Sequence, residues 1–255
     1  SKDLIHWDYI HPLFVGDRSE TGEMWECPNF FPLDEKHVFL YSPTPEFLYT
    51  RYFIGTYANH KFVPEVKGNT DFGGYFYAAQ VFLDDKGRRI MWGWLKEGRS
   101  DKASREAGWT GVMSLPRILS ILPDGQLGME PTPELSMLRR KPYQLGDINL
   151  TPESSQVLKG IEDDCLEILA EFEPDDAREF GIKLLSSPNG EEETLVVYDL
   201  AQKHLAINGK RSSLSSEVNL DARGGNFELR DGESLNLHIF LDRSVVEVFA
   251  NGRAC

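Results

Sequence analysis

The sequence predicts an all-β protein. Short stretches rich in β-branched and aromatic residues recur along most of its 255 residues. Turn-forming pairs separate many of them, including Asp124-Gly125, Asn189-Gly190 and Asp231-Gly232. Strands at this spacing, with turn chemistry between them, are typical of sandwiches, barrels and propellers. No stretch with a helical period is long enough to compete with this interpretation.

The first half is expected to hold a series of short strands. The stretch Met24-Trp25-Glu26-Cys27-Pro28 begins the series, and Pro28 places it at a sheet edge or a strand end. Residues 96–106 are charged and are predicted to form a loop. Further strands are predicted at residues 37–41, 49–57, 61–64, 74–82, 89–95 and 112–119.

A short helix and a connector are predicted next. Thr132 can cap a helix that has Pro133 at its first position and Glu134 in its first turn. The polar residues 142–160 are predicted to connect the two halves of the chain.

The second half is again predicted to be β. Residues 166–173 alternate between apolar and polar, the period of a half-buried strand. The pattern predicts an antiparallel sandwich with one wet face on each sheet. Glu247 alternates with Val246 and Val248, so we expect it to face solvent. The further strands are predicted at residues 180–185, 194–200, 205–207, 227–229, 235–241 and 245–249.

The charge balance excludes some classes of partner. The chain has 41 acidic and 27 basic residues, a net charge of -14. Nucleic acids and anionic membranes need basic patches, so we expect neither as a partner. No apolar run approaches the ~20 residues of a membrane span, and no signal peptide opens the chain. We expect a soluble protein, either cytoplasmic or secreted, with a neutral ligand such as a sugar.

The cysteine and histidine spacings indicate no metal site. Cys27, Cys165 and Cys255 lie far apart, and the six histidines form no close pair of metal-ligand spacing. The sequence therefore indicates neither a metal centre nor a disulfide framework, and we expect no cofactor.

Glu26 is the candidate catalytic residue. It stands between a tryptophan and a cysteine and is followed by Pro28 and two phenylalanines. A carboxyl group in such apolar surroundings suits proton donation to a leaving group. The alternative is that Glu26 lies on a polar strand face beside a core tryptophan.

Several short motifs along the chain together carry a resemblance to a known family. Together with the Glu26 stretch they resemble glycoside hydrolase family 32, which includes invertases, levanases, inulinases and fructan hydrolases. The resemblance covers essentially the whole chain. The motifs are Asp71-Phe72-Gly73, Trp92-Gly93-Trp94, Gly108-Trp109-Thr110-Gly111, Ser114-Leu115-Pro116-Arg117 and residues 243–252.

The resemblance implies the later blades of a five-bladed β-propeller followed by a C-terminal β-sandwich. We expect the partial propeller at residues 1–141 and a sandwich, truncated at its end, at 161–255. The implied activity is retaining hydrolysis of terminal β-D-fructofuranosyl linkages in sucrose or fructans. In that scheme two carboxyl groups act in turn, and the match makes Glu26 the acid/base.

The resemblance also implies substrate-binding residues. Asp71 matches an aspartate that holds sugar hydroxyls, although an Asx-turn at Asp71-Phe72-Gly73-Gly74 is an alternative. Tyr77, Trp92 and Trp94 are expected to form an apolar wall, and the alternative for the tryptophans is propeller core. Arg117 is expected to be a salt-bridge partner rather than a ligand.

Two segments of the family pattern are missing. The family's nucleophile lies in an Asn-Asp-Pro-Asn-Gly segment, and a second aspartate lies in an Arg-Asp-Pro triplet. This sequence contains neither. The resemblance therefore implies a fragment whose missing N-terminal segment, or self-association, covers the open propeller. The alternatives are a fructan hydrolase or fructosyltransferase of the same family, or, for the fragment alone, a non-catalytic carbohydrate-binding module.

Overall fold

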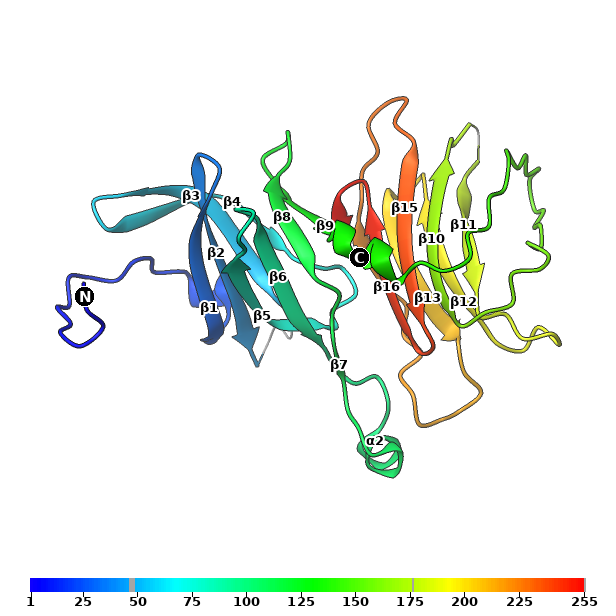
Figure 1. Cartoon of the computed structure of the whole chain (residues 1–255), viewed down its shortest axis with the longest axis horizontal. Helices are drawn as coiled ribbons and strands as arrows, with labels where there is room; N and C mark the ends of the chain where they lie inside the picture. Colours follow the sequence, from blue (N-terminus) through cyan, green and yellow to red (C-terminus); the bar gives the residue numbers. More distant parts are fainter. Residues whose placement is uncertain (46–48, 176, 255) are drawn as a thin grey trace.

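The computed structural model describes residues 1–45, 49–175 and 177–254, so Cys255 lies outside the described residues. These residues form four antiparallel sheets, two in each half of the chain. Figure 1 shows the two halves side by side, with β8 and β9 next to the C-terminal half. Among the residues that the structure describes, no helix has the length and apolar character needed to cross a membrane.

The first sheet is a four-stranded meander. Its order is β1-β2-β3-β4, and the short helix α1 (Arg18–Thr21) precedes it. Asn59 and His60 both have positive φ between β3 and β4, as a tight turn matched to strand twist requires. The strands are β1 (Met24–Leu33), β2 (Lys36–Thr44), β3 (Arg51–Ala58) and β4 (Lys61–Asn69).

The second sheet repeats this arrangement with an added strand. Its order is β5-β6-β8-β9, and β7 pairs with the end of β6. Two successive four-stranded meanders are the blades of a propeller. The single strand predicted at residues 112–119 is wrong, because Ser114, Leu115 and Pro116 separate two strands. The strands are β5 (Phe76–Leu83), β6 (Arg89–Leu95), β7 (Val112–Met113), β8 (Arg117–Ile121) and β9 (Leu127–Pro131).

Residues 96–106 are not simply a loop, as the sequence had suggested. They contain most of α2 (Asp101–Ala107). The Ser100 side chain accepts a hydrogen bond from the backbone N–H of Ala103 at 3.2 Å, and Gly108 ends the helix in the left-handed conformation. The serine cap and the closing glycine are the signals that predict such a helix, and they outweigh the charged composition.

The short helix after Pro131 is a 3-10 helix, η1 (Pro133–Leu138). Pro133 opens it as predicted, but the Thr132 side chain makes no capping hydrogen bond. Residues 139–164, all of them described, form neither helix nor strand. The domain boundaries drawn from the sequence remain a prediction.

The C-terminal half packs two four-stranded sheets against each other. One has the order β10-β15-β16-β17, and the other β11-β12-β13-β14. Both sheets contribute to one apolar core, which includes Val196, Ile239 and Val248. This is the predicted sandwich. Its strands are β10 (Cys165–Phe172), β11 (Glu179–Leu184), β12 (Glu193–Asp199), β13 (His204–Arg211), β14 (Arg223–Asn226), β15 (Leu235–Asp242), β16 (Val245–Ala250) and β17 (Arg253–Ala254).

Two predictions for this half are wrong. The strand expected at residues 227–229 instead occupies β14, and buried Phe227 follows it. Glu247 does not face solvent; it is 6% exposed. The sandwich packs against the second blade at β16, so the face that carries Glu247 is covered by Leu115 and Arg117. Phe249 accordingly belongs to the apolar core that the two blades share.

Candidate active site

A bulge interrupts the first strand of each blade. The pairing of β1 shifts between Glu26 and Asn29, and the pairing of β5 shifts between Tyr77 and Gln80. Within each bulge one residue has positive φ, Cys27 at 49° and Ala78 at 53°. A bulge bends its strand and redirects the neighbouring side chains. Here the side chains next to the bulges are Glu26 and Tyr77.

Asn29 fastens one bulge to the other. Its Nδ2 donates to the carbonyl oxygens of Cys27 and Ala79, at 2.9 Å each, and its Oδ1 accepts from the N–H of Val81 at 3.0 Å. The sequence reasoning missed this residue. The signal that could have found it is Pro28, since proline inside a strand marks a bulge whose freed backbone groups need side-chain partners.

Tyr77 contacts Glu26 directly. Its hydroxyl donates to Glu26 Oε2 at 2.8 Å, and its side chain is buried. Burial, followed by the adjacent Glu26 carboxyl, raises the pKa of Tyr77 to about 12. The hydroxyl therefore remains a hydrogen-bond donor to Glu26 throughout the pH range in which proteins fold. The apolar-wall interpretation of Tyr77 did not include this polar contact.

The Tyr77 bulge is also held from β2. The N–H of Ala78 donates to Ser42 Oγ at 3.0 Å, and Ser42 Oγ lies 3.0 Å from Thr50 Oγ1. Ser42 and Thr50 are both almost fully buried. Contacts from the first blade thus hold the backbone next to Tyr77 in the second blade.

Asp71 lies in the segment between β4 and β5 and is 6% exposed. Its Oδ1 accepts from the N–H of Gly74 at 2.7 Å, so the Asx-turn contact is present. Burial raises the pKa of Asp71, while the positive charges of Arg117 and Lys96 oppose the rise. The contact with Gly74 uses Oδ1 and does not decide between a turn and a sugar-binding role.

Besides Arg117, the cations Lys96 and Arg223 lie near Asp71. Lys96 Nζ lies 5.4 Å from the centre of the Tyr77 ring. Burial lowers the pKa of Lys96, Arg223 adds to this effect, and Asp71 opposes it. Arg223 comes from the sandwich strand β14, and its guanidinium lies 5.0 Å from the centre of the Tyr75 ring. The sequence pattern indicated neither cation. The position of Arg223 depends on how the sandwich meets the blade, and Lys96 is placed by the hydrogen bond from its N–H to the carbonyl of Tyr75 at 3.0 Å.

The tryptophans of β6 differ in exposure. Trp94 pairs with Tyr77 across the sheet, so their side chains share one face, and Trp94 is 44% exposed. Its indole packs on Gly111, where a Cβ atom would lie 2.0 Å from Nε1. Trp92 pairs with Gln80 and is partly buried. An exposed ring on the face of Tyr77 suits a sugar wall better than a core position.

The segment after Lys96 is tied to the sandwich. Glu97 accepts from Arg99 Nη2 at 2.8 Å and from the N–H of Gly111 at 3.1 Å. The Arg99 guanidinium lies 3.9 Å from the centre of the Trp109 ring. The N–H of Ser100 donates to the carbonyl of Glu217 at 2.7 Å, in the connection between β13 and β14. The sandwich therefore helps to place this segment.

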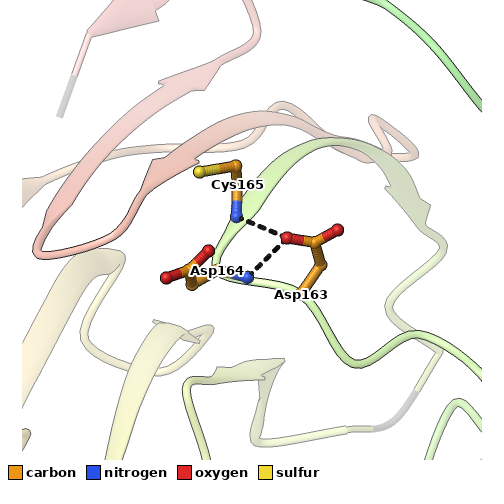
Figure 2. A group of neighbouring side chains, drawn as sticks. All are labelled: Asp163, Asp164 and Cys165. Carbon is orange, nitrogen blue, oxygen red and sulfur yellow. Dashed lines mark hydrogen bonds between the residues drawn. The ribbon is translucent and has the colours of Figure 1, made fainter.

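Among the residues that the structure describes, one group of potential metal ligands lies away from this site. Figure 2 shows Asp163, Asp164 and Cys165 at the start of β10, all of them exposed. Asp163 Oδ1 accepts from the N–H groups of Asp164 and Cys165, at 2.9 and 3.2 Å. These hydrogen bonds hold the backbone where β10 begins, and we assign no metal to this group.

The sequence matches a family in both halves. The N-terminal domain of glycosyl hydrolases family 32 matches residues 1–131, and the family's C-terminal domain matches residues 134–255. A sucrose-6-phosphate hydrolase of Zymomonas mobilis is 29% identical over 264 residues, covering 98% of this chain and 50% of that protein. An insoluble β-fructofuranosidase isoenzyme of Oryza sativa is 30% identical over 320 residues, covering 100% of this chain and 53% of that protein.

Solved structures give the same result. Fructan 1-exohydrolase IIa from Cichorium intybus has a TM-score of 0.88 at 25% identity, covering 99% of this chain and 58% of that one. Sucrose-6-phosphate hydrolase from Lactobacillus gasseri has a TM-score of 0.81 at 25% identity, covering 99% and 52%.

The chain spans about half the length of the curated relatives it matches. Within that span it has the all-β fold expected from its sequence, part of a propeller followed by a sandwich. Both family domains match it in order, and together they account for nearly all of its residues. The chain belongs to glycoside hydrolase family 32.

Proposed function

We propose that Glu26 is the acid/base of a retaining hydrolase that cleaves terminal β-D-fructofuranosyl linkages. The observation that carries the proposal is the 2.8 Å hydrogen bond from Tyr77 to Glu26, at the point where the two blades meet. A carboxyl group on bulged strands, with a permanent donor on one oxygen, is oriented for proton transfer through the other.

The reaction uses a second carboxylate that this sequence does not contain. That carboxylate attacks the anomeric carbon of the fructosyl unit, and the leaving oxygen takes the proton from Glu26 as its bond to carbon breaks. In the second step Glu26 takes a proton from water. The water oxygen bonds to the anomeric carbon, and the bond between that carbon and the attacking carboxylate breaks. These steps need no cofactor.

Tyr77 sets which oxygen of Glu26 carries the proton. Its hydroxyl donates to Oε2, and its raised pKa keeps it a donor in both steps. The proton of neutral Glu26 then resides on Oε1, which is the oxygen left to face the leaving group.

Asp71 and the Trp94 ring are proposed to hold the sugar. A buried carboxylate with Lys96 nearby can accept hydrogen bonds from vicinal hydroxyls. The exposed Trp94 ring can cover an apolar sugar face. Trp92 is proposed to support that ring from the same strand.

Sucrose and fructans are the two candidate substrates. Relatives named as β-fructofuranosidase and as fructan 1-exohydrolase match the whole chain at similar identity. The fructan exohydrolase structure in complex with 1-kestose has a TM-score of 0.88 and favours a fructan as the second candidate. The alternative reaction is the transfer of fructose to a sugar instead of to water, as in a fructosyltransferase.

The test is a product assay on the complete gene product that contains this sequence. We expect free fructose from sucrose, inulin or levan, and loss of that release in Glu26→Gln. The matched control is Glu23→Gln, an exposed carboxylate on the same segment, which should leave the rate unchanged. Sugar binding without fructose release from any of the three substrates contradicts the enzymatic proposal and supports a binding module.

A further inference from the structure

We infer that Arg117 and Glu247 form a positioning pair. Through this pair the sandwich holds in place the two segments that carry the candidate site residues Asp71 and Tyr77. The inference rests on the proposed function, because it concerns how Asp71 and Tyr77 reach their working positions. It makes the C-terminal sandwich a part of the active-site framework.

The pair is buried at the junction of blade and sandwich. The Arg117 and Glu247 side chains are 2% and 7% exposed, and Arg117 Nη2 donates to Glu247 Oε2 at 3.0 Å. Glu247 Oε1 accepts from the N–H of Leu115 at 2.7 Å. Both carboxylate oxygens of this sandwich residue are therefore bound to the second blade.

Arg117 contacts the residue before each of the two candidate site residues. Its Nη1 donates to the carbonyl of Thr70, which precedes Asp71, at 3.4 Å. Its guanidinium lies 4.0 Å from the centre of the Phe76 ring, and Phe76 precedes Tyr77. Phe249 of the sandwich lies 5.4 Å from the same guanidinium. A shift of Arg117 would therefore move both segments together.

Backbone hydrogen bonds join these two segments to each other. The N–H of Thr70 donates to the carbonyl of Thr50, and the N–H of Thr50 donates to the carbonyl of Phe76, both at 3.1 Å. On the other side of Asp71, the Phe72 ring packs on Gly225 of β14, where a Cβ atom would lie 2.7 Å from the ring. Asp71 is thus held between two contacts that depend on the sandwich.

If the pair served only to hold blade and sandwich together, apolar side chains would suffice. Two charges taken out of water gain little net stability over apolar side chains of similar volume, so holding two units together does not require an ion pair. The ion pair differs from an apolar pair in two ways. Arg117 donates a hydrogen bond to the carbonyl of Thr70, and the charges of Arg117 and Glu247 act on the carboxyl group of Asp71.

The field at Asp71 gives the pair a measurable signature. The charged groups around Asp71 are Arg117 on β8, Glu247 on β16 and Lys96 after β6, with Arg223 of β14 beside Gly73 and Gly74. Arg117 lowers the pKa of Asp71 and Glu247 raises it. Neutralising Glu247 should therefore lower the pKa of Asp71, and neutralising Arg117 should raise it.

The experiment measures kcat and KM for sucrose, and the pKa of the Asp71 carboxyl by NMR titration, in the complete gene product. The variants are Glu247→Gln, Arg117→Met and the apolar double replacement Arg117→Met/Glu247→Leu. Glu228→Gln is the control, since it neutralises an exposed sandwich carboxylate that pairs with Lys203. Thermal melting identifies the variants that fold.

We expect an NMR titration to give the Asp71 carboxyl a lower pKa in Glu247→Gln, and a higher pKa in Arg117→Met, than in the parent. The folded double variant should lose ~10-fold or more in kcat/KM, because displacement of positioned groups is costly. The control should match the parent in all three quantities. If Arg117→Met does not fold, Glu247→Gln and the double variant carry the test.

An Asp71 pKa that is the same in Glu247→Gln as in the parent overturns the inference, as does a folded double variant with the parent's kcat/KM. Either result leaves the pair as a structural contact alone. Failure of the proposed function looks different: the parent then releases no fructose, or Glu26→Gln keeps the parent rate. In that case an NMR titration of the Asp71 carboxyl in the parent and in Glu247→Gln still tests the field, with the same expected direction.

Discussion

Tyr77 donates a hydrogen bond to Glu26 across the boundary between two propeller blades, with 2.8 Å between the tyrosine oxygen and Glu26 Oε2. The two residues are 51 positions apart in the sequence, and each lies next to a bulge in the first strand of its blade. The contact makes the alignment of the blades a determinant of how Glu26 is oriented.

Removal of this hydroxyl should impair proton transfer without unfolding the protein. For Tyr77→Phe in the complete gene product we expect kcat on sucrose to fall ~10- to 100-fold. The cost in stability should be only about 1 kcal/mol, the net value of one hydrogen bond. The control is Tyr57→Phe, an exposed tyrosine of the first blade. A Tyr77→Phe enzyme with the parent rate would mean that Glu26 needs no orienting donor.

The ionisation of Tyr77 should not limit activity at ordinary pH. Its pKa is raised to about 12, so the hydroxyl stays protonated below that value and remains a donor to Glu26. We expect the pH–rate profile to show no tyrosine limb below pH ~11. An ultraviolet titration that finds Tyr77 ionising at the ordinary tyrosine value would contradict this expectation; the Tyr77→Phe variant identifies its signal.

Loss of the Asn29 side chain should affect both stability and rate. Asn29→Ala leaves the carbonyls of Cys27 and Ala79 and the N–H of Val81 without this partner. We expect about 2–3 kcal/mol less stability to urea unfolding, and a fall in kcat because both bulges lose their connection. Asn149→Ala, at an exposed position between the two halves, is the control. Equal stability of the two variants would refute the role of Asn29.

Glu97 should make the protein sensitive to acid. Arg99 holds the pKa of Glu97 at about 2, below its ordinary value of 4.5. A depressed pKa means that the stabilisation is complete above pH 4.5 and is lost as the pH falls toward 2. We expect Glu97→Gln to remove that part of the acid sensitivity, up to ~3 kcal/mol. The measurement is urea unfolding of the chain at several pH values in this window.

The control for this experiment is Glu106→Gln, an exposed carboxylate of α2. It should leave the dependence of stability on pH as in the parent. A Glu97→Gln chain that loses stability between pH 4.5 and 2 as steeply as the parent would show that Glu97 does not anchor the segment after Lys96.

The 255-residue chain by itself should not hydrolyse sucrose above the background rate at any pH. Its sequence contains neither of the two aspartate segments that the family resemblance requires for attack and transition-state stabilisation. An acid/base without a nucleophile lacks the first chemical step. Sucrose hydrolysis by this chain that is abolished by Glu26→Ala would contradict this prediction. That result would require a nucleophile among the 255 residues of this chain.

Local patterns predicted the fold because strands and turns depend on neighbouring residues. The alternation at residues 166–173 and the turn pairs are local. The alternation corresponds to β10, and Asp124-Gly125 and Asn189-Gly190 lie in the hairpins β8–β9 and β11–β12, while Asp231-Gly232 connects the two sheets of the sandwich. The position of Glu247 could not be predicted in the same way. Alternation assigned it to a face of its strand, but contact with the second blade decides that this face is covered.

The candidate site shows the same limit. Glu26, Asp71 and Trp94 could be singled out from motifs. The Tyr77 hydroxyl contact, the Asn29 connection and the cations Lys96 and Arg223 could not, because each depends on residues that are distant in the sequence. The helix α2 differs, because its signals are local: Ser100 caps it and Gly108 ends it, and only its charged composition suggests a loop.

The most direct test of the central claim compares two leaving groups in Glu26→Gln. The complete gene product is assayed on sucrose, whose leaving oxygen needs a proton, and on p-nitrophenyl β-D-fructofuranoside, whose nitrophenolate leaves without one. If Glu26 is the acid, the rate of fructose-linkage cleavage should fall by ~10²- to 10⁴-fold on sucrose. The first burst of nitrophenolate should be nearly unchanged. Equal losses on the two substrates, or none on sucrose, would contradict the assignment of Glu26.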